Sequence, residues 1–141
     1  MTKKYEILAE FVKDISYETP NIETYLHTKD NISKYNLNLD INSKFLKNKM
    51  IEINIISKFQ EVNLVEKKSN FEITYAAIIK INENIEDENE MKKIVLCYVP
   101  SEIYPRLESL FITMINKCGF PEVKIQRKVD FEKLYKERSN N

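Results

Sequence analysis

One stretch of this chain, residues 97 to 131, limits the possible folds more than any other. It contains the only glycine and three of the four prolines of the sequence. Pro105 suits the first turn of a helix, because proline has no N–H to donate and its φ is already helical. Gly119 suits the left-handed residue that ends a helix, and Pro121 stops the helix from continuing. We therefore expect a long helix between Pro105 and Gly119.

This expected helix has a wide apolar face. Apolar residues recur along it every three or four positions, as on one helical face: Leu107, Leu110, Phe111, Met114, Ile115 and Cys118. A helix on a single sheet needs one apolar stripe, so the extra width indicates a second contact surface. We interpret that surface as a partner subunit, and the alternative is a helix buried inside one monomer. The predicted subunit interface consists of Leu107, Leu110, Phe111, Ile112, Met114 and Ile115.

Length and charge exclude several classes of protein. A chain of 141 residues is expected to form one domain, residues 1–141, with residues 1–7 and 137–141 as flexible ends. Lys and Arg total 22, as do Asp and Glu, so no overall field attracts nucleic acid. No apolar run approaches the twenty residues that a bilayer requires. We expect a cytoplasmic protein with no direct membrane insertion.

The sequence offers little catalytic equipment. Cys97 and Cys118 lie in apolar contexts and are interpreted as small buried residues, with a disulfide or a metal pair as the alternatives. His27 is the only histidine, which argues against a zinc site or a Ser-His or Cys-His catalytic unit. A single glycine leaves no phosphate-binding loop. We predict no catalytic residue, no metal site and no cofactor, and an enzyme remains only a remote alternative.

Four segments alternate between apolar and polar residues, as strands with one solvated face do: residues 11–18, 36–41, 50–62 and 71–81. In the first segment, Phe11, Ile15 and Tyr17 are predicted on one face and Asp14, Ser16 and Glu18 on the other. The carboxylates are expected to lie on a solvated sheet face, either without a specific role or as a binding surface.

The remaining segments are connections and a short helix. Residues 19–35 are predicted to form a long connection, 67–70 a polar turn, 82–93 a charged loop, 94–99 a short apolar run and 123–125 an extended link. Asp130 is expected to cap a short final helix. The predicted fold is α+β, a four-stranded antiparallel sheet with one long and one short helix on one face.

Aromatic residues in the predicted connections and near the chain end suit recognition of extended apolar polypeptide, although they also suit the core. These residues are Tyr25, Tyr35, Tyr104, Phe120, Phe131 and Tyr135.

Four blocks of sequence carry a family resemblance. They are FVKDISYETPN, FEITYAAI, VPSEIYPRLESLFITMI and the pair GFPEV and VDFEKLY. In this order and spacing the chain resembles the SecB family of protein-export chaperones over roughly residues 8 to 136. The resemblance implies a dimer of dimers, a homotetramer, with the long helices between the dimers. It implies an ATP-independent chaperone that binds unfolded preproteins and delivers them to the SecA translocation ATPase.

The resemblance also implies two sets of functional residues. Asp14, Glu18 and Glu72 lie inside matching blocks and are expected to contact SecA. The expected client-binding groove consists of Tyr25, Leu26, Tyr35, Phe131, Leu134 and Tyr135. Members of the family are typically acidic whereas this chain is neutral, and this leaves open a SecB-like chaperone dedicated to an antitoxin. A structural oligomer without clients is a further alternative.

Overall fold

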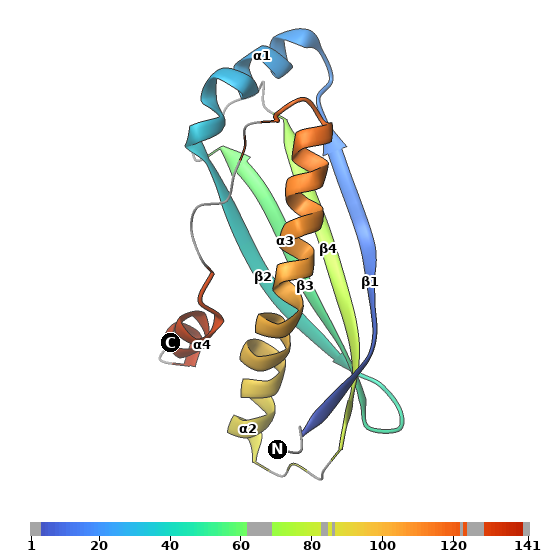
Figure 1. Ribbon diagram of the computed structural model, residues 1–141. Coiled ribbons are helices and arrows are strands. Elements are labelled where there is room, and N and C mark those ends of the chain that lie inside the picture. Colours follow the sequence, from blue (N-terminus) through green and yellow to red (C-terminus); the bar gives the residue numbers. More distant parts are fainter. Residues whose placement is uncertain are drawn as a thin grey trace.

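The computed structural model describes residues 4–61, 69–82, 85, 87–121, 123 and 129–139. Four strands form one antiparallel sheet in the spatial order β1-β4-β3-β2, and the long helix crosses one face of it (Figure 1). This confirms the predicted α+β class. The strands are β1 (Tyr5–Glu18), β2 (Tyr35–Phe45), β3 (Met50–Glu61) and β4 (Asn70–Ile81). The helices are α1 (Ile22–Asn31), α2 (Glu88–Lys93), α3 (Val99–Lys117) and α4 (Phe131–Ser139).

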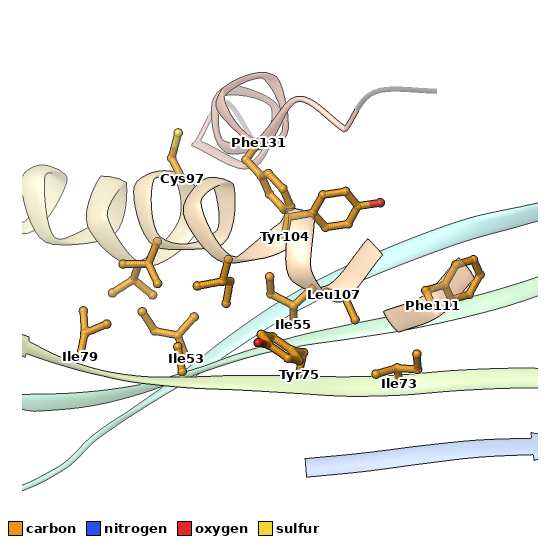
Figure 2. Packing of buried hydrophobic residues seen from close by; sticks show 14 of the residues in the cluster. Ile53, Ile55, Ile73, Tyr75, Ile79, Cys97, Tyr104, Leu107, Phe111 and Phe131 are labelled. Carbon is orange, nitrogen blue, oxygen red and sulfur yellow. The ribbon is translucent and has the colours of Figure 1, made fainter. Parts of the chain in front are cut away.

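The core lies between the central strands and α3. Ile53, Ile55 and Ile73 are completely buried on the helix-facing side of the sheet, as alternation predicted. Leu107 and Phe111 of α3 pack onto them (Figure 2), with the Phe111 ring centroid 5.3 Å from that of Phe59. Apolar burial of this kind supplies most of the free energy that favours folding.

The long helix begins much earlier than the prolines predict. Helix α2, the π-helical turn Ile94–Tyr98 and α3 follow one another without a break, so that residues 88–117 form one helical rod. The expectation of a charged loop was therefore wrong for residues 88–93, and the short apolar run at 94–99 is helical. Pro105 lies inside α3 rather than in its first turn. A proline inside a helix costs about 3 kcal/mol, and packing of the rod on the sheet outweighs this local preference.

Strand β1 contains an irregularity that alternation did not predict. The pairing register with β4 shifts between Val12 and Asp14, which makes Lys13 an extra residue. Phe11 consequently pairs with Ala76, whereas Ile15 pairs with Ile73 on the opposite face. The prediction that Phe11 shares a face with Ile15 and Tyr17 was wrong. Phe11 instead lies on the face that points away from the helices, which we call the outer face.

The predicted connection at 19–35 contains a helix. Asn21 caps α1 by accepting a hydrogen bond from the Thr24 N–H at 2.8 Å. The helix buries Thr24 and Thr28 and leaves Ile22 and Leu26 exposed. Its buried side is therefore polar, and the apolar periodicity that identifies most helices is absent.

Regular secondary structure extends into both segments that were expected to be flexible ends. Residues 5–7 belong to β1, with Tyr5 only 9% exposed, and residues 137–139 belong to α4. The Asp130 carboxylate accepts a hydrogen bond from the Lys133 N–H at 3.1 Å, which confirms the predicted cap of α4. Residues 62–68, 124 and 125, where a strand end, a turn and an extended link were predicted, lie outside the described residues in whole or in part.

Candidate functional site

The three carboxylates predicted to bind SecA lie together on the outer face. Glu72 of β4 pairs with Ser16, the residue between Asp14 and Glu18 on that side of β1. Diagonal neighbours on adjacent strands lie about 7–8 Å apart, so Glu72 is within that distance of both other acids. Asp14 and Glu18 are exposed and Glu72 is half-buried. The arrangement is an acidic surface, bordered on the β3 side by the exposed Lys58 that pairs with Glu72, and a basic partner could contact it without rearrangement of the sheet.

The bulge in β1 adds apolar surface to this acidic region. It places Phe11, 39% exposed, on the same outer face as Asp14. On β3, Ile56 is half-buried and faces Thr74, which in turn pairs with Asp14. Protein-binding surfaces commonly combine an apolar centre with a polar rim, and these partly exposed apolar side chains beside the acids supply both kinds of surface. Sequence reasoning missed Phe11 because alternation carries no signal for a bulge.

The six residues predicted to bind clients fall into two groups. Tyr25, Leu26 and Tyr35 lie at the α1 end of the molecule, whereas the other three belong to α4, beside the first half of the helical rod (Figure 1). The structure does not bring the two groups into contact through these side chains. They are therefore two surfaces, which we call the α1 surface and the α4 surface.

On the α1 surface only Leu26 is well exposed, at 49%. The Tyr25 hydroxyl donates to the Gly119 carbonyl at 2.8 Å, and its ring packs 5.2 Å from that of Phe120. Tyr35 is buried, and burial raises the pKa of its phenol. The two tyrosines thus hold α1 against the end of α3 and the sheet.

On the α4 surface, Phe131 is the residue that holds the helix. It is 3% exposed and packs edge-on against Tyr104 of α3, with ring centroids 5.4 Å apart (Figure 2). Leu134 is 37% exposed and Tyr135 is half-buried, so these two remain accessible. The edge strand β2 has apolar side chains that are only partly buried: Leu37, Leu39 and Ile41.

The predicted subunit interface lies largely inside the subunit. Leu107, Phe111 and Ile115 are at most 1% exposed and Met114 is 9% exposed, all against the subunit's own sheet. Leu110 and Ile112 are half-buried and lie on the two flanks of that stripe. The width of the apolar face therefore reflects burial within one subunit for four of the six residues.

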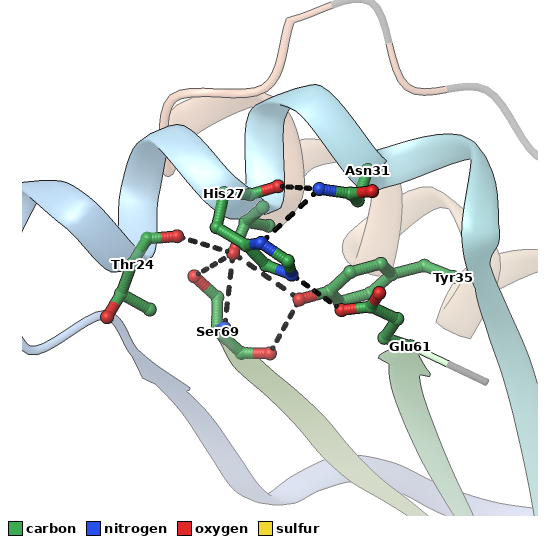
Figure 3. Close-up of polar contacts among 7 residues, drawn as sticks. Thr24, His27, Asn31, Tyr35, Glu61 and Ser69 are labelled. Atoms are coloured by element: carbon green, nitrogen blue, oxygen red, sulfur yellow. Dashed lines mark hydrogen bonds and ion pairs between the residues drawn. The ribbon is translucent and has the colours of Figure 1, made fainter. Parts of the chain in front are cut away.

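A polar cluster docks α1 onto the ends of β3 and β4 (Figure 3). The Thr28 hydroxyl lies 2.8 Å from both the Thr24 carbonyl oxygen and the Ser69 hydroxyl. His27 Nε2 lies 3.0 Å from the Glu61 carboxylate, whose side chain is 3% exposed. Since these polar groups form hydrogen bonds with one another, we interpret the cluster as a structural one.

The structure offers no metal-binding cluster among the described residues. Cys97 is buried and Cys118 half-buried, both as free thiols, and burial raises the pKa of each. They are therefore protonated and weakly nucleophilic. A surface hollow of about 620 Å³ lies beside Tyr5, whose hydroxyl donates to Glu102 at 2.7 Å, and the Lys4–Glu90 ion pair lines it. In the part of the chain that is described, no helix is long and apolar enough to cross a membrane.

Comparison with known proteins identifies the family. The family model described as preprotein translocase subunit SecB matches residues 1–141. The chain belongs to the SecB family. Its members are export chaperones and are not enzymes. A putative protein-export protein SecB of Pelagibacter ubique is 49% identical over 140 residues, which cover 99% of this chain and 100% of that protein.

More distant relatives carry the same name. The protein-export protein SecB of Bradyrhizobium diazoefficiens is 24% identical over 131 residues, covering 93% of this chain and 80% of the relative. A SecB-like chaperone of Mycobacterium tuberculosis, solved in complex with an antitoxin peptide, superposes with a TM-score of 0.65. It shares 10% identity and covers 89% of this chain and 91% of its own, so this likeness shows the fold alone.

Proposed function

We propose that this SecB family member is an ATP-independent chaperone that keeps preproteins unfolded in the cytoplasm and delivers them to SecA for export. The observation that carries the proposal is the family match along residues 1–141, together with the 49% identity to a putative export SecB. The relatives matched by sequence, at 49% and 24% identity, are named export proteins, which favours export over a role dedicated to an antitoxin.

Client binding would use apolar side chains that the subunit leaves accessible. Leu26 on the α1 surface and Leu134 on the α4 surface are 49% and 37% exposed. An unfolded chain exposes the apolar residues that a folded one buries, so contacts of this kind select unfolded clients without a sequence motif. Binding the unfolded form slows folding by mass action and needs no nucleotide.

Contact with SecA would use the acidic outer face. Asp14 and Glu18 flank Glu72 across the strand pair, on the side of the sheet away from the helical rod. Client and SecA contacts would therefore use different sides of the subunit. A basic surface on the partner would be attracted by charge, and added salt would weaken this attraction.

Assembly would proceed to a dimer of dimers, a homotetramer. Leu110 and Ile112 are the interface candidates that remain partly accessible on the helical rod. The other four predicted interface residues are already buried within the subunit. They would support the interface only indirectly, by fixing the position of the helical rod on the sheet.

A refolding assay tests client holding. A slowly folding client is diluted from denaturant with equimolar tetramer, and we expect its folding to be delayed. Leu26→Ser with Leu134→Ser should lower client affinity at least about tenfold, because each leucine loses roughly 1.5–3 kcal/mol of burial. The matched control is Phe45→Ser with Leu46→Ser, two exposed apolar residues at the β2–β3 hairpin. No delay by the wild type, or equal loss in both variants, contradicts the proposal.

Charge reversal tests the SecA surface separately. Asp14→Lys with Glu18→Lys should weaken SecA binding by about tenfold at low salt while the refolding delay is unchanged. Asp30→Lys with Glu137→Lys makes the same change in charge at exposed positions on α1 and α4. If both pairs weaken SecA binding equally, the outer face has no specific role.

A further inference from the structure

The β2–β3 hairpin carries an exposed apolar and basic tip that the proposed function does not use. Phe45 is 66% exposed and Leu46 is 37% exposed at the end of β2. Lys44, Lys47 and Lys49 flank them in the sequence, and all three are exposed. Residues 44–49, KFLKNK, contain no acidic residue.

The tip is a rigid, convex projection. The Leu46 N–H donates to the Met50 carbonyl at 2.8 Å, and the Ile81 N–H donates to the Lys49 carbonyl at 3.0 Å, which fixes the turn against the end of β4. In Figure 1 the hairpin loop projects beyond the body of the sheet at that end. A convex tip cannot enclose a peptide, which needs a groove. A projecting hairpin of this kind can instead insert into a flat, deformable surface.

Among the described residues, the positive charge of the tip is only partly balanced by acidic side chains. Glu52 pairs with Lys44 in the strand register, but its carboxylate is already 3.2 Å from Lys13 Nζ. Within the described part of the chain, neither Lys47 nor Lys49 has an ion-pair partner. The acidic first turn of α2 lies on the other side of this end of the molecule in Figure 1.

The backbone of the turn is unusual at Lys49. Asn48 and Lys49 have φ values of 62° and 61°, the left-handed conformation of a type I′ turn. Asparagine tolerates this conformation well, whereas the second position of such a turn favours glycine. A lysine here keeps a positive charge in the turn at the expense of local stability.

We propose that this hairpin tip binds the surface of anionic lipid membranes, with Phe45 and Leu46 entering the interface and the three lysines contacting lipid headgroups. An exposed aromatic ring in a short lysine-rich hairpin provides the two contributions, apolar insertion and charge attraction, that reversible surface binding requires. The contact is peripheral and needs no membrane-spanning segment. It does not depend on the proposed chaperone function.

Vesicle flotation tests this proposal. The full chain has a net charge of zero, so general attraction of the whole molecule to anionic lipid is not expected. We expect the protein to float with phosphatidylcholine vesicles that contain phosphatidylglycerol, not with phosphatidylcholine alone, and to be released by salt. Phe45→Ser should lower the partition coefficient roughly tenfold and Lys47→Gln about fivefold. The matched controls Ile22→Ser and Lys29→Gln, both on α1 at the far end of the molecule, should leave it unchanged.

The variant Lys49→Gly distinguishes an effect on vesicle binding from an effect on stability. Glycine relieves the left-handed backbone, so the variant should melt at a higher temperature while binding anionic vesicles about fivefold more weakly. A purely structural turn would not give these opposite changes. The proposal is overturned if the wild type does not float, or if tip and control variants lose binding equally. It is also overturned if tip variants instead alter self-association or binding to polyglutamate while vesicle binding is unchanged.

Discussion

Tyr25 and Gly119 are in direct contact where α1 meets the end of α3. The Tyr25 hydroxyl donates to the Gly119 carbonyl at 2.8 Å, and a Cβ at position 119 would lie 2.8 Å from the tyrosine ring. Gly119 also has a φ of 108°, a conformation that other residues rarely adopt. The only glycine of the chain is therefore required both for its conformation and for the absence of a side chain.

Gly119→Ala should lower the free energy of unfolding by about 1–3 kcal/mol, because the strained backbone and the ring contact both oppose the methyl group. Urea unfolding followed by circular dichroism measures the change. Tyr25→Phe, which removes only the hydrogen bond, should cost about 1 kcal/mol. An alanine variant as stable as the wild type would show that α1 can move away from residue 119.

Tyr104 and Tyr5 provide a contrast between an unsatisfied and a satisfied phenol. Among the described residues, the buried Tyr104 hydroxyl has no partner in hydrogen-bonding geometry, although the Glu108 carboxylate is nearby, whereas Tyr5 donates to Glu102 at 2.7 Å. An unpaired buried polar group costs about 1–3 kcal/mol. Tyr104→Phe should therefore leave the unfolding free energy unchanged or raise it, and Tyr5→Phe should lower it. A clear loss of stability in Tyr104→Phe would indicate a hydrogen bond in solution.

Stability should fall at alkaline pH. Burial raises the pKa of Tyr5 and of Tyr104 well above the usual value, and the nearby carboxylates of Glu102 and Glu108 raise it further. Both phenols are neutral in the folded protein and ionise near pH 10 in the unfolded chain. Ionisation therefore favours the unfolded chain. The free energy of unfolding is unaffected by these phenols below about pH 10 and declines as the pH rises above that value.

Urea titrations at a series of alkaline pH values measure this decline. Tyr5→Phe should make the unfolding free energy less dependent on pH, because the variant has one fewer phenol that ionises on unfolding. An identical pH dependence in the variant and the wild type would show that Tyr5 ionises equally in both states.

Ile112→Lys should weaken subunit association. Ile112 is half-buried on a flank of the helical rod and packs only against the edge of the core, so a lysine there would place a charge in the proposed interface while the fully buried residues stay in place. Sedimentation velocity should show smaller species at low protein concentration. Asp30→Lys on α1 is the control for added charge. An unchanged sedimentation profile would place the interface elsewhere.

The sequence predicted the elements whose buried sides are apolar. Alternating isoleucines such as Ile53 and Ile55 identify the central strands. The spacing of Leu107, Phe111 and Ile115 correctly identifies the face of α3 that is buried. Helix α1 was missed because its buried residues are threonines, held by hydroxyl hydrogen bonds rather than by apolar contact. The early start of the rod was missed because the first turns of α2 are charged.

The candidate sites were predicted unevenly for a similar reason. The three acids share a face because strand alternation is regular from Asp14 onward. The position of Phe11 depends on the bulge at Lys13, which leaves no local signal. The predicted aromatic client residues proved partly structural, since Tyr25, Tyr35 and Phe131 hold the two surfaces in place.

The measurement that tests the account most directly is the mass in solution of the purified protein with and without an unfolded preprotein, by size-exclusion chromatography with light scattering. We predict a tetramer that gains the mass of a bound client when the preprotein is unfolded and not when it is folded. A stable monomer that binds no unfolded chain would contradict both the assembly and the chaperone function.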